Sequence, residues 1–213
     1  MSSDDLILNL STDLAPVRRR RMPREAALLI ALGAAELALL VGAGLMRPDM
    51  GRMIASPYMV WKLGSLAVLA LIGGTVAIRS FSPTTRPLRG LTLALAAAVA
   101  AMIAGPFMTP GGEAGLTILE RLAPAHGLVC ATSIIVLSLP IMALLGMLMR
   151  RGAPAHPRQS ALAAGLAAGT CGAFVFAFCC PVNDPLYVIV WYCAGCATVA
   201  ATARWLLPRR FRL

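Results

Sequence analysis

Residues 123–149 read APAHGLVCATSIIVLSLPIMALLGMLM and contain no Asp, Glu, Lys or Arg. A helix rises about 1.5 Å per residue, so roughly 20 apolar residues are enough to cross the hydrocarbon core of a bilayer. This stretch is therefore predicted to be a membrane-spanning helix. Pro140 lies inside it and is expected to kink the helix, because neighbouring helices can compensate for the backbone hydrogen bond that proline removes.

Five further apolar blocks of similar length make up most of the remaining sequence, and prolines mark the short connections between them. The six predicted spans are 25–46, 58–80, 88–107, 123–149, 159–178 and 186–207. The chain is 59% hydrophobic and 13% charged, with a mean hydropathy of +0.78, whereas soluble domains carry about 25% charged residues. The sequence predicts an all-α membrane protein with six transmembrane helices and excludes a soluble domain.

The formal net charge of +10 comes from arginines placed between the apolar blocks. They form no aromatic-studded basic face, so direct binding of nucleic acid is not expected. Fifteen of the nineteen basic residues would lie on one side of the lipid bilayer, and the other four are Arg47, Arg52, Lys62 and Arg121. Because basic residues concentrate in cytoplasmic loops, both termini are predicted to be cytoplasmic, in a multi-pass protein of the bacterial inner membrane.

The predicted organisation has three parts. Residues 1–24 form a cytoplasmic N-terminal tail, residues 25–207 form the six-helix membrane domain, and residues 208–213 form a short basic cytoplasmic C-terminus. A helix through the tail would have one apolar face, made of Leu6, Ile7, Leu10, Leu14 and Val17. Since the tail also carries acidic residues, we expect this face to bind a protein partner in preference to an anionic bilayer.

The cysteines differ in their expected depth in the membrane. Cys130 is expected about two turns inside the external end of its span, and Cys179 and Cys180 at the external end of the next span, so these thiols could meet. A periplasmic position permits a disulfide. His126 precedes Cys130 by four residues, which places both side chains on one helix face. The remaining cysteines are expected to be small buried apolar residues: Cys171, Cys193 and Cys196.

Two chemistries remain open for these residues. Thiolate and imidazole groups are suitable ligands for Zn or Cu, which would involve Cys130, Cys180 and His126. Thiolates are also the groups that oxidants attack. No cofactor is therefore assigned with certainty, and either a metal ion or an oxidant could act at this position.

Two ionisable residues fall within the predicted spans. Glu36 lies near the middle of the first span, and Lys62 lies about one turn inside the second. Such groups are costly within a bilayer and often have a function. The two side chains could pair between adjacent helices, or Lys62 could extend outward to the membrane surface.

Several motifs together point to a known family. They are DDLI at 4–7, LAPVRRR at 14–20, HGLVC at 126–130, LSLP at 137–140, RRGAP at 150–154, CPxxDPL at 180–186 and WY at 191–192. In these motifs, and over nearly its whole length, the chain resembles the membrane anti-sigma factors of the negative-regulator-of-sigma-F (NrsF) family.

The resemblance implies a regulatory protein and not an enzyme. In this family a short cytoplasmic tail holds an extracytoplasmic-function sigma factor inactive, and two cysteines near the periplasmic face take part in signalling. Those cysteines correspond to Cys130 and Cys180. Release of the sigma factor would then follow when they meet an oxidant or a heavy metal. Where the family commonly has His-Cys-Pro, this chain has Cys179-Cys180-Pro181, which adds a third thiol.

Two other classes of function remain open. A membrane thiol-disulfide oxidoreductase would pass electrons from Cys130 and Cys179 or Cys180 to a quinone. Against it, the Cys-x-x-Cys motif at 193–196 lies within an apolar span and does not face the exterior. A small metal transporter has support only from external methionines and Glu36.

Overall fold

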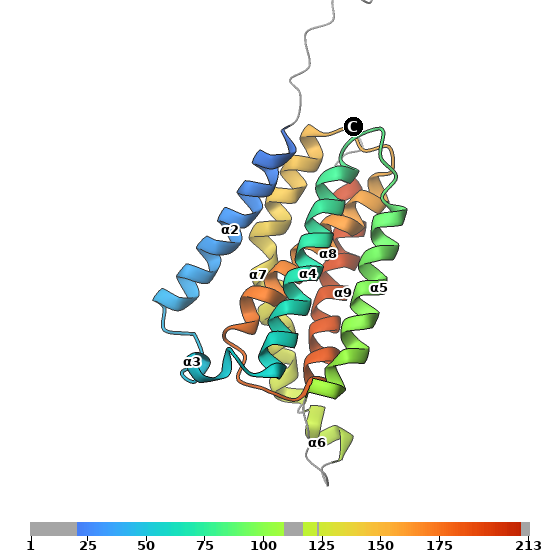
Figure 1. The fold of residues 1–213 in the computed structure, drawn as a ribbon. Helices are drawn as coiled ribbons and strands as arrows, with labels where there is room; N and C mark the ends of the chain where they lie inside the picture. The colour runs from blue at the N-terminus through green and yellow to red at the C-terminus, as the bar shows by residue number, and fades with distance from the viewer. Residues whose placement is uncertain (1–20, 109–116, 123, 210–213) are drawn as a thin grey trace, which may run out of the picture.

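The computed structural model describes residues 21–108, 117–122 and 124–209. Six helices in these ranges are long and apolar enough to cross a membrane. They are α2 (Met22–Gly42), α4 (Pro57–Ser80), α5 (Leu88–Ala104), α7 (Pro124–Arg151), α8 (Pro157–Ala177) and α9 (Pro185–Arg209). The connections contain α3 (Met50–Met53), the 3-10 turn η1 (Gly105–Met108) and α6 (Ile118–Leu122). No strand occurs in the described ranges, so the predicted all-α fold with six membrane-length helices is confirmed (Figure 1).

Prolines begin most of the long helices. The first residues of α4, α7, α8 and α9 are Pro57, Pro124, Pro157 and Pro185. The first position of a helix suits proline, because a backbone N–H there would have no partner within the helix. The prolines therefore mark helix starts, as the sequence predicts, and α7 continues through Pro140.

The first helix ends earlier than hydropathy predicts, at Gly42. Gly44 adopts a left-handed backbone conformation with φ of 70°, which glycine accepts without steric cost. The N–H of Leu45 then donates a hydrogen bond to the carbonyl of Leu40 at 3.0 Å, and the N–H of Gly44 donates one to the carbonyl of Val41 at 3.0 Å. This pair of bonds is a Schellman motif, which stops the helix although the sequence stays apolar beyond it.

α8 lies at the centre of the bundle and packs against α4, α7 and α9. It is rich in alanine and glycine, and most of its residues are buried. A Cβ atom added to Gly165 would lie 2.7 Å from the Cα atom of Ala200 on α9, which is closer than real side chains approach. Small residues therefore allow α8 and α9 to pack backbone against backbone.

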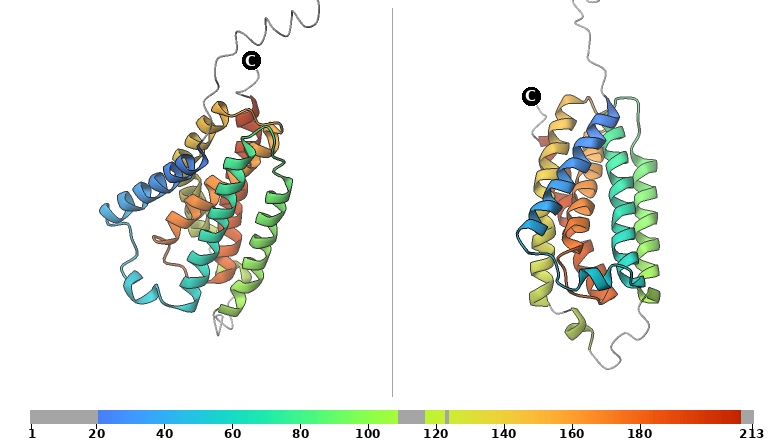
Figure 2. Two further views of the ribbon diagram at one scale, coloured as in Figure 1. Left: turned by 45° about the horizontal axis from the view of Figure 1, so that its top comes forward. Right: turned by 60° about the vertical axis from the view of Figure 1, so that its left-hand side comes forward.

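α2 packs more loosely at the edge of the bundle. Its only buried residues are Glu25 and Glu36 among those described, and it contacts α4, α7 and α8 over a limited surface. Figure 2 shows α2 crossing the outside of the bundle. The helix nearest the N-terminal tail is thus one of the least constrained in the molecule.

The bundle has two distinct ends (Figure 1). At the terminal end lie the start of α2, the end of α9 and the loops α4–α5 and α7–α8. At the opposite end, which we name the α3 end, lie α3, α6 and the loop 178–184 between α8 and α9. The first described helix therefore begins, and the last one ends, at the same end of the bundle.

Candidate functional site

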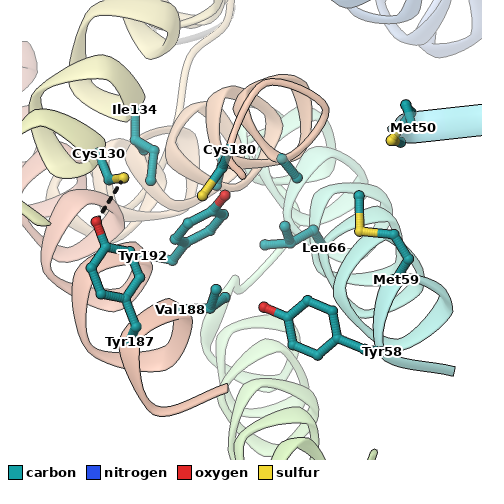
Figure 3. Close-up of a cluster of buried hydrophobic side chains, with 12 residues drawn as sticks. Met50, Tyr58, Met59, Leu66, Cys130, Ile134, Cys180, Tyr187, Val188 and Tyr192 are labelled. Atoms are coloured by element: carbon teal, nitrogen blue, oxygen red, sulfur yellow. Dashed lines mark hydrogen bonds between the residues drawn. The ribbon is translucent and has the colours of Figure 1, made fainter. Parts of the chain in front are cut away.

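Cys130 and Cys180 come together inside the α3 end of the bundle. Cys130 lies on the second turn of α7, and Cys180 belongs to loop 178–184. Both are buried, with 6% and 0% of their surface exposed, and both thiols are free. They share one group of buried side chains with Tyr187 and Tyr192 of α9 (Figure 3). We name Cys130, Cys180, Tyr187, Tyr192 and the neighbouring Lys62 the cysteine cluster.

The two thiols have different surroundings. The Cys130 sulfur lies 3.1 Å from the hydroxyl oxygen of Tyr187. Hydrogen bonding from the Cys130 thiol, helped by the positive charge of Lys62, lowers the pKa of Cys180, although burial opposes this shift. A lower pKa favours the thiolate, which is the form that reacts with oxidants and binds soft metals. Cys180 is therefore the thiol whose surroundings favour reaction.

Lys62 points into the cysteine cluster and not outward. Its exposure is 1%, and its Nζ atom donates a hydrogen bond to the carbonyl of Val182 at 3.4 Å. The same Nζ atom lies 5.4 Å from the centre of the Tyr192 ring. Both carboxylate oxygens of Glu36 are buried with no hydrogen-bond partner among the described residues. The sequence left two alternatives for Lys62, pairing with Glu36 or extension to the membrane surface. The position of Lys62 in the structure differs from both.

Loop 178–184 is anchored on the side of α9 and α6. Arg121 donates two hydrogen bonds to the carboxylate of Asp184, at 2.8 and 3.0 Å. Asp184 also accepts a hydrogen bond of 2.8 Å from the backbone N–H of Leu186, in the first turn of α9. Burial raises the pKa of Asp184, but the hydrogen bonds from Arg121 and the backbone outweigh it and lower the pKa overall. These bonds therefore fix the position of the loop relative to α6 and to the first turn of α9.

The same loop is held from the other side by Arg47. The guanidinium of Arg47 donates hydrogen bonds to the carbonyl of Cys180 at 3.4 Å and to the side-chain oxygen of Asn183 at 3.0 Å. Two further bonds of 2.6 Å join it to Asp49, and hydrogen bonding from Arg47 lowers the pKa of Asp49. Arg47 is 5% exposed, so its guanidinium is enclosed by the protein, although the side chain of Asp49 is 47% exposed.

Two of the predicted sensor residues lie outside the cysteine cluster. His126 is exposed, although it is four residues from the buried Cys130 on the same helix, and Cys179 is only partly buried. Within the described ranges, no group of three or more His, Cys, Asp or Glu residues could hold a metal ion. Zinc sites usually have four ligands, so these residues do not fit zinc. Two adjacent thiols remain suited to disulfide formation or to a soft ion such as Cu(I).

The predicted partner-binding face of the tail lies outside the described residues, and its members are Leu6, Ile7, Leu10, Leu14 and Val17. Sequence reasoning did not assign a role to Tyr187, Tyr192 or Arg47. A signal for Arg47 was present, because it is one of the four basic residues on the otherwise arginine-poor side. A charge retained on that side, where few basic residues occur, indicates a specific structural partner.

The comparisons with known proteins agree with the motifs. The family described as "Negative regulator of sigma F" matches residues 10–213. The anti-sigma-F factor NrsF of Caulobacter vibrioides is 31% identical over 216 residues, covering 97% of this chain and 99% of that protein. The probable anti-sigma-F factor NrsF of Azospira oryzae is 29% identical, covering 94% of each chain. No solved structure matches. With six membrane-length helices and a match over nearly its whole length, this chain belongs to the negative regulator of sigma F family.

Proposed function

We propose that this chain is an anti-sigma factor of the bacterial inner membrane. Residues 1–24 hold an extracytoplasmic-function sigma factor at the cytoplasmic face, and reaction of Cys130 and Cys180 at the periplasmic face releases it. Membership of a family of negative regulators supports this function over a thiol-disulfide oxidoreductase or a metal transporter. The partners are then the sigma factor and the lipid bilayer, with no direct contact to nucleic acid.

The observation that carries the sensor proposal is the meeting of the two thiols. They come from α7 and from the loop after α8, and they meet in a buried cluster at the α3 end. α2, which follows the tail in sequence, begins at the terminal end. Most arginines precede α2 in sequence, lie in or beside the loops α4–α5 and α7–α8, or lie near or after the end of α9. This distribution favours a cytoplasmic position for the terminal end. A signal received at one face is thereby separated from an output at the other.

Two signals fit this pair of thiols. An oxidant can take two electrons while the thiols lose two protons and form a disulfide bond. Alternatively, a soft metal ion can replace the two protons and bind both thiolates. Either event links α7 to loop 178–184 more tightly than a hydrogen bond does. We propose that this linkage changes the packing between two discrete arrangements of the helices.

The sensor proposal is tested with Cys130→Ser and Cys180→Ser. A reporter dependent on the sigma factor is measured in cells treated with hydrogen peroxide or a copper salt. We expect both variants to lose induction while repression without treatment persists. Cys193→Ser is the matched control, because Cys193 is exposed on α9 outside the cysteine cluster, and it should respond normally. Normal induction in both test variants would remove the basis for a cysteine sensor.

The anti-sigma assignment is tested separately through the tail. Deletion of residues 1–17 should release the sigma factor and make the reporter constitutive. In the full chain, Leu10→Asp would disrupt the apolar face, whereas Thr12→Asp adds the same charge on the opposite side of the expected helix. Purification from the native membrane should recover a sigma factor with the wild-type chain and with Thr12→Asp but not with Leu10→Asp. A reporter that stays repressed after the deletion would contradict the proposed role of the tail.

A further inference from the structure

The cysteine cluster and the start of α2, which follows the tail, lie at opposite ends of the bundle. The cluster is built by α4, α7, α9 and loop 178–184, whereas the tail continues into α2, which packs loosely on the bundle. The buried side chains of α2, Glu25 and Glu36, belong to neither hydrophobic cluster. Direct helix packing therefore offers only a weak route from the thiols to α2.

Arg47 supplies a direct route. It follows α2 by five residues and bonds to loop 178–184 at three positions. Its backbone N–H donates to the carbonyl of Phe178 at 3.3 Å, and its guanidinium donates to Cys180 and Asn183, as described above. Cys180 thus interacts with Cys130 through its side chain and with Arg47 through its carbonyl oxygen. Arg47 thus joins the cysteine cluster to the end of α2 by hydrogen bonds, and the apolar side chains of Met46 and Met50 pack beside it in the same buried group.

Arg47 is held rigidly on both sides. Asp49 accepts two parallel hydrogen bonds of 2.6 Å from the guanidinium, a geometry that fixes the guanidinium plane. On the other side, the Schellman motif at Gly44 fixes the direction in which the chain leaves α2. A displacement of loop 178–184 is therefore passed to α2 and is not absorbed by a flexible connection.

Because Arg47 is buried, separating its guanidinium from loop 178–184 is energetically costly. The side chain of Arg47 is 3% exposed, and a buried guanidinium that loses its acceptors suffers a large desolvation penalty. When Cys130 and Cys180 are drawn together, the Cys180 carbonyl shifts with its own side chain. Arg47 must then follow the loop, and the end of α2 follows Arg47.

From these contacts we infer that Arg47 is the coupling residue that transmits a change at Cys180 to α2 and so to the N-terminal tail. This inference rests on the proposed function, because it assigns a path to the proposed signal. It adds a role for a residue outside both the thiol pair and the tail. The coupling acts through position and needs no change in the charge of Arg47.

The test uses Arg47→Gln in the full chain, with Arg52→Gln as the matched control. Arg52 is exposed on α3 at the same end of the bundle, so both variants remove one positive charge there. Cells are treated with diamide, which oxidises pairs of thiols directly. Two quantities are measured in parallel: the fraction of chain with a Cys130–Cys180 disulfide, by a gel shift with a maleimide polymer, and the sigma-dependent reporter.

We expect Arg47→Gln to form the disulfide like the wild type, while the ratio of induced to basal reporter activity falls to near one. Arg52→Gln should retain the wild-type ratio. An Arg47→Gln chain that forms the disulfide and still induces fully would overturn the inference. If the wild type itself forms the disulfide without induction, the proposed function fails instead, so the two failures are distinguishable.

A second variant guards against loss of folding in Arg47→Gln. Two glycines inserted between Gly44 and Leu45 leave every contact of Arg47 possible but make its connection to α2 flexible. The disulfide should again form while the induction ratio falls toward one. Full induction in this insertion variant would also overturn the inference, whatever the level of Arg47→Gln in the membrane.

Discussion

Lys62 brings a buried positive charge to Cys180, and this contact has a measurable consequence for thiol reactivity. Lys62→Met keeps the length of the side chain but removes the charge, so the pKa of Cys180 should rise and its thiolate fraction at neutral pH should fall. The measurement is the rate at which methyl methanethiosulfonate modifies Cys180, followed by mass spectrometry in a Cys179→Ala background. The pH profile of this rate should shift to higher pH by on the order of one pH unit.

A matched variant separates charge from packing at this position. Lys62→Arg retains the positive charge, so its pH profile for modification of Cys180 should stay near that of the wild type. If Lys62→Met reacts with the wild-type pH profile, the charge of Lys62 has no influence on Cys180. Because only relative rates are compared, burial of the thiol affects all variants alike.

Asp184 is a second residue whose ionisation supports the structure. Its pKa is lowered in the folded protein, so its ionised form stabilises the fold at pH values above the pKa of the unfolded chain. That contribution disappears as the pH falls through the folded-state pKa. Asp184→Asn should lower the free energy of unfolding by about 1 kcal/mol at pH 7, since it weakens a helix cap and an ion pair.

The expected loss is measured by thermal unfolding in detergent at pH 7 and near pH 3. The wild type and Asp184→Asn should differ at pH 7 and approach one another at the lower pH. Arg121→Gln should reproduce part of the effect, because it removes one set of hydrogen bonds to Asp184. A difference between wild type and Asp184→Asn that is equally large at both pH values would contradict this assignment.

At the level of elements, the contact between α8 and α9 sets the rigidity of the bundle. Gly165→Ala would place a Cβ atom 2.7 Å from the Cα atom of Ala200, so the two helices must separate. Overpacking of this kind costs about 1–3 kcal/mol. We expect a lower midpoint of thermal unfolding in detergent than for the wild type.

The control for this prediction is Gly64→Ala on α4, where an added Cβ atom meets nothing within 4 Å. Alanine is favoured over glycine inside a helix, so this change should be neutral or stabilising. Equal midpoints for the two variants would show that the α8–α9 contact does not require glycine. The same comparison distinguishes close packing from a general effect of glycine replacement.

The elements also differ in how easily they can move. α8 is surrounded by other helices, whereas α2 has a limited contact surface and two buried residues among those described. Elements with few buried apolar contacts open and shift at low free-energy cost. α2 is therefore suited to transmit a small displacement, provided that its end is attached to the cysteine cluster.

For the whole molecule, the proposed orientation predicts which loops are accessible from outside the cell. Ala55 is exposed at the α3 end, and Ala155 is exposed in the loop between α7 and α8 at the terminal end. In a cysteine-free background, Ala55→Cys should react with a membrane-impermeant maleimide added to cells with a permeabilised outer membrane. Ala155→Cys should react only after the inner membrane is disrupted. The reverse pattern would place the thiol pair in the cytoplasm and contradict the proposed sensor.

The sequence by itself was sufficient for the fold class, the six helices and the family. Apolar blocks of membrane length leave a helix as the only way to satisfy the backbone hydrogen bonds in hydrocarbon, and this constraint acts locally along the chain. Prolines and the 180–186 motif are equally local signals. Hydropathy missed the early end of α2, because a single left-handed glycine, Gly44, stops the helix without any change in polarity.

Only the tertiary structure decided which side chains share a site. The direction of Lys62 toward the cysteine cluster, the exposure of His126 and the bonds of Arg47 to loop 178–184 depend on how helices rotate and pack around α8. Residues distant in sequence meet there because close packing of small side chains sets the positions of whole helices. A local pattern contains no information on that rotation, so the link from Cys180 to α2 was visible only in the folded chain.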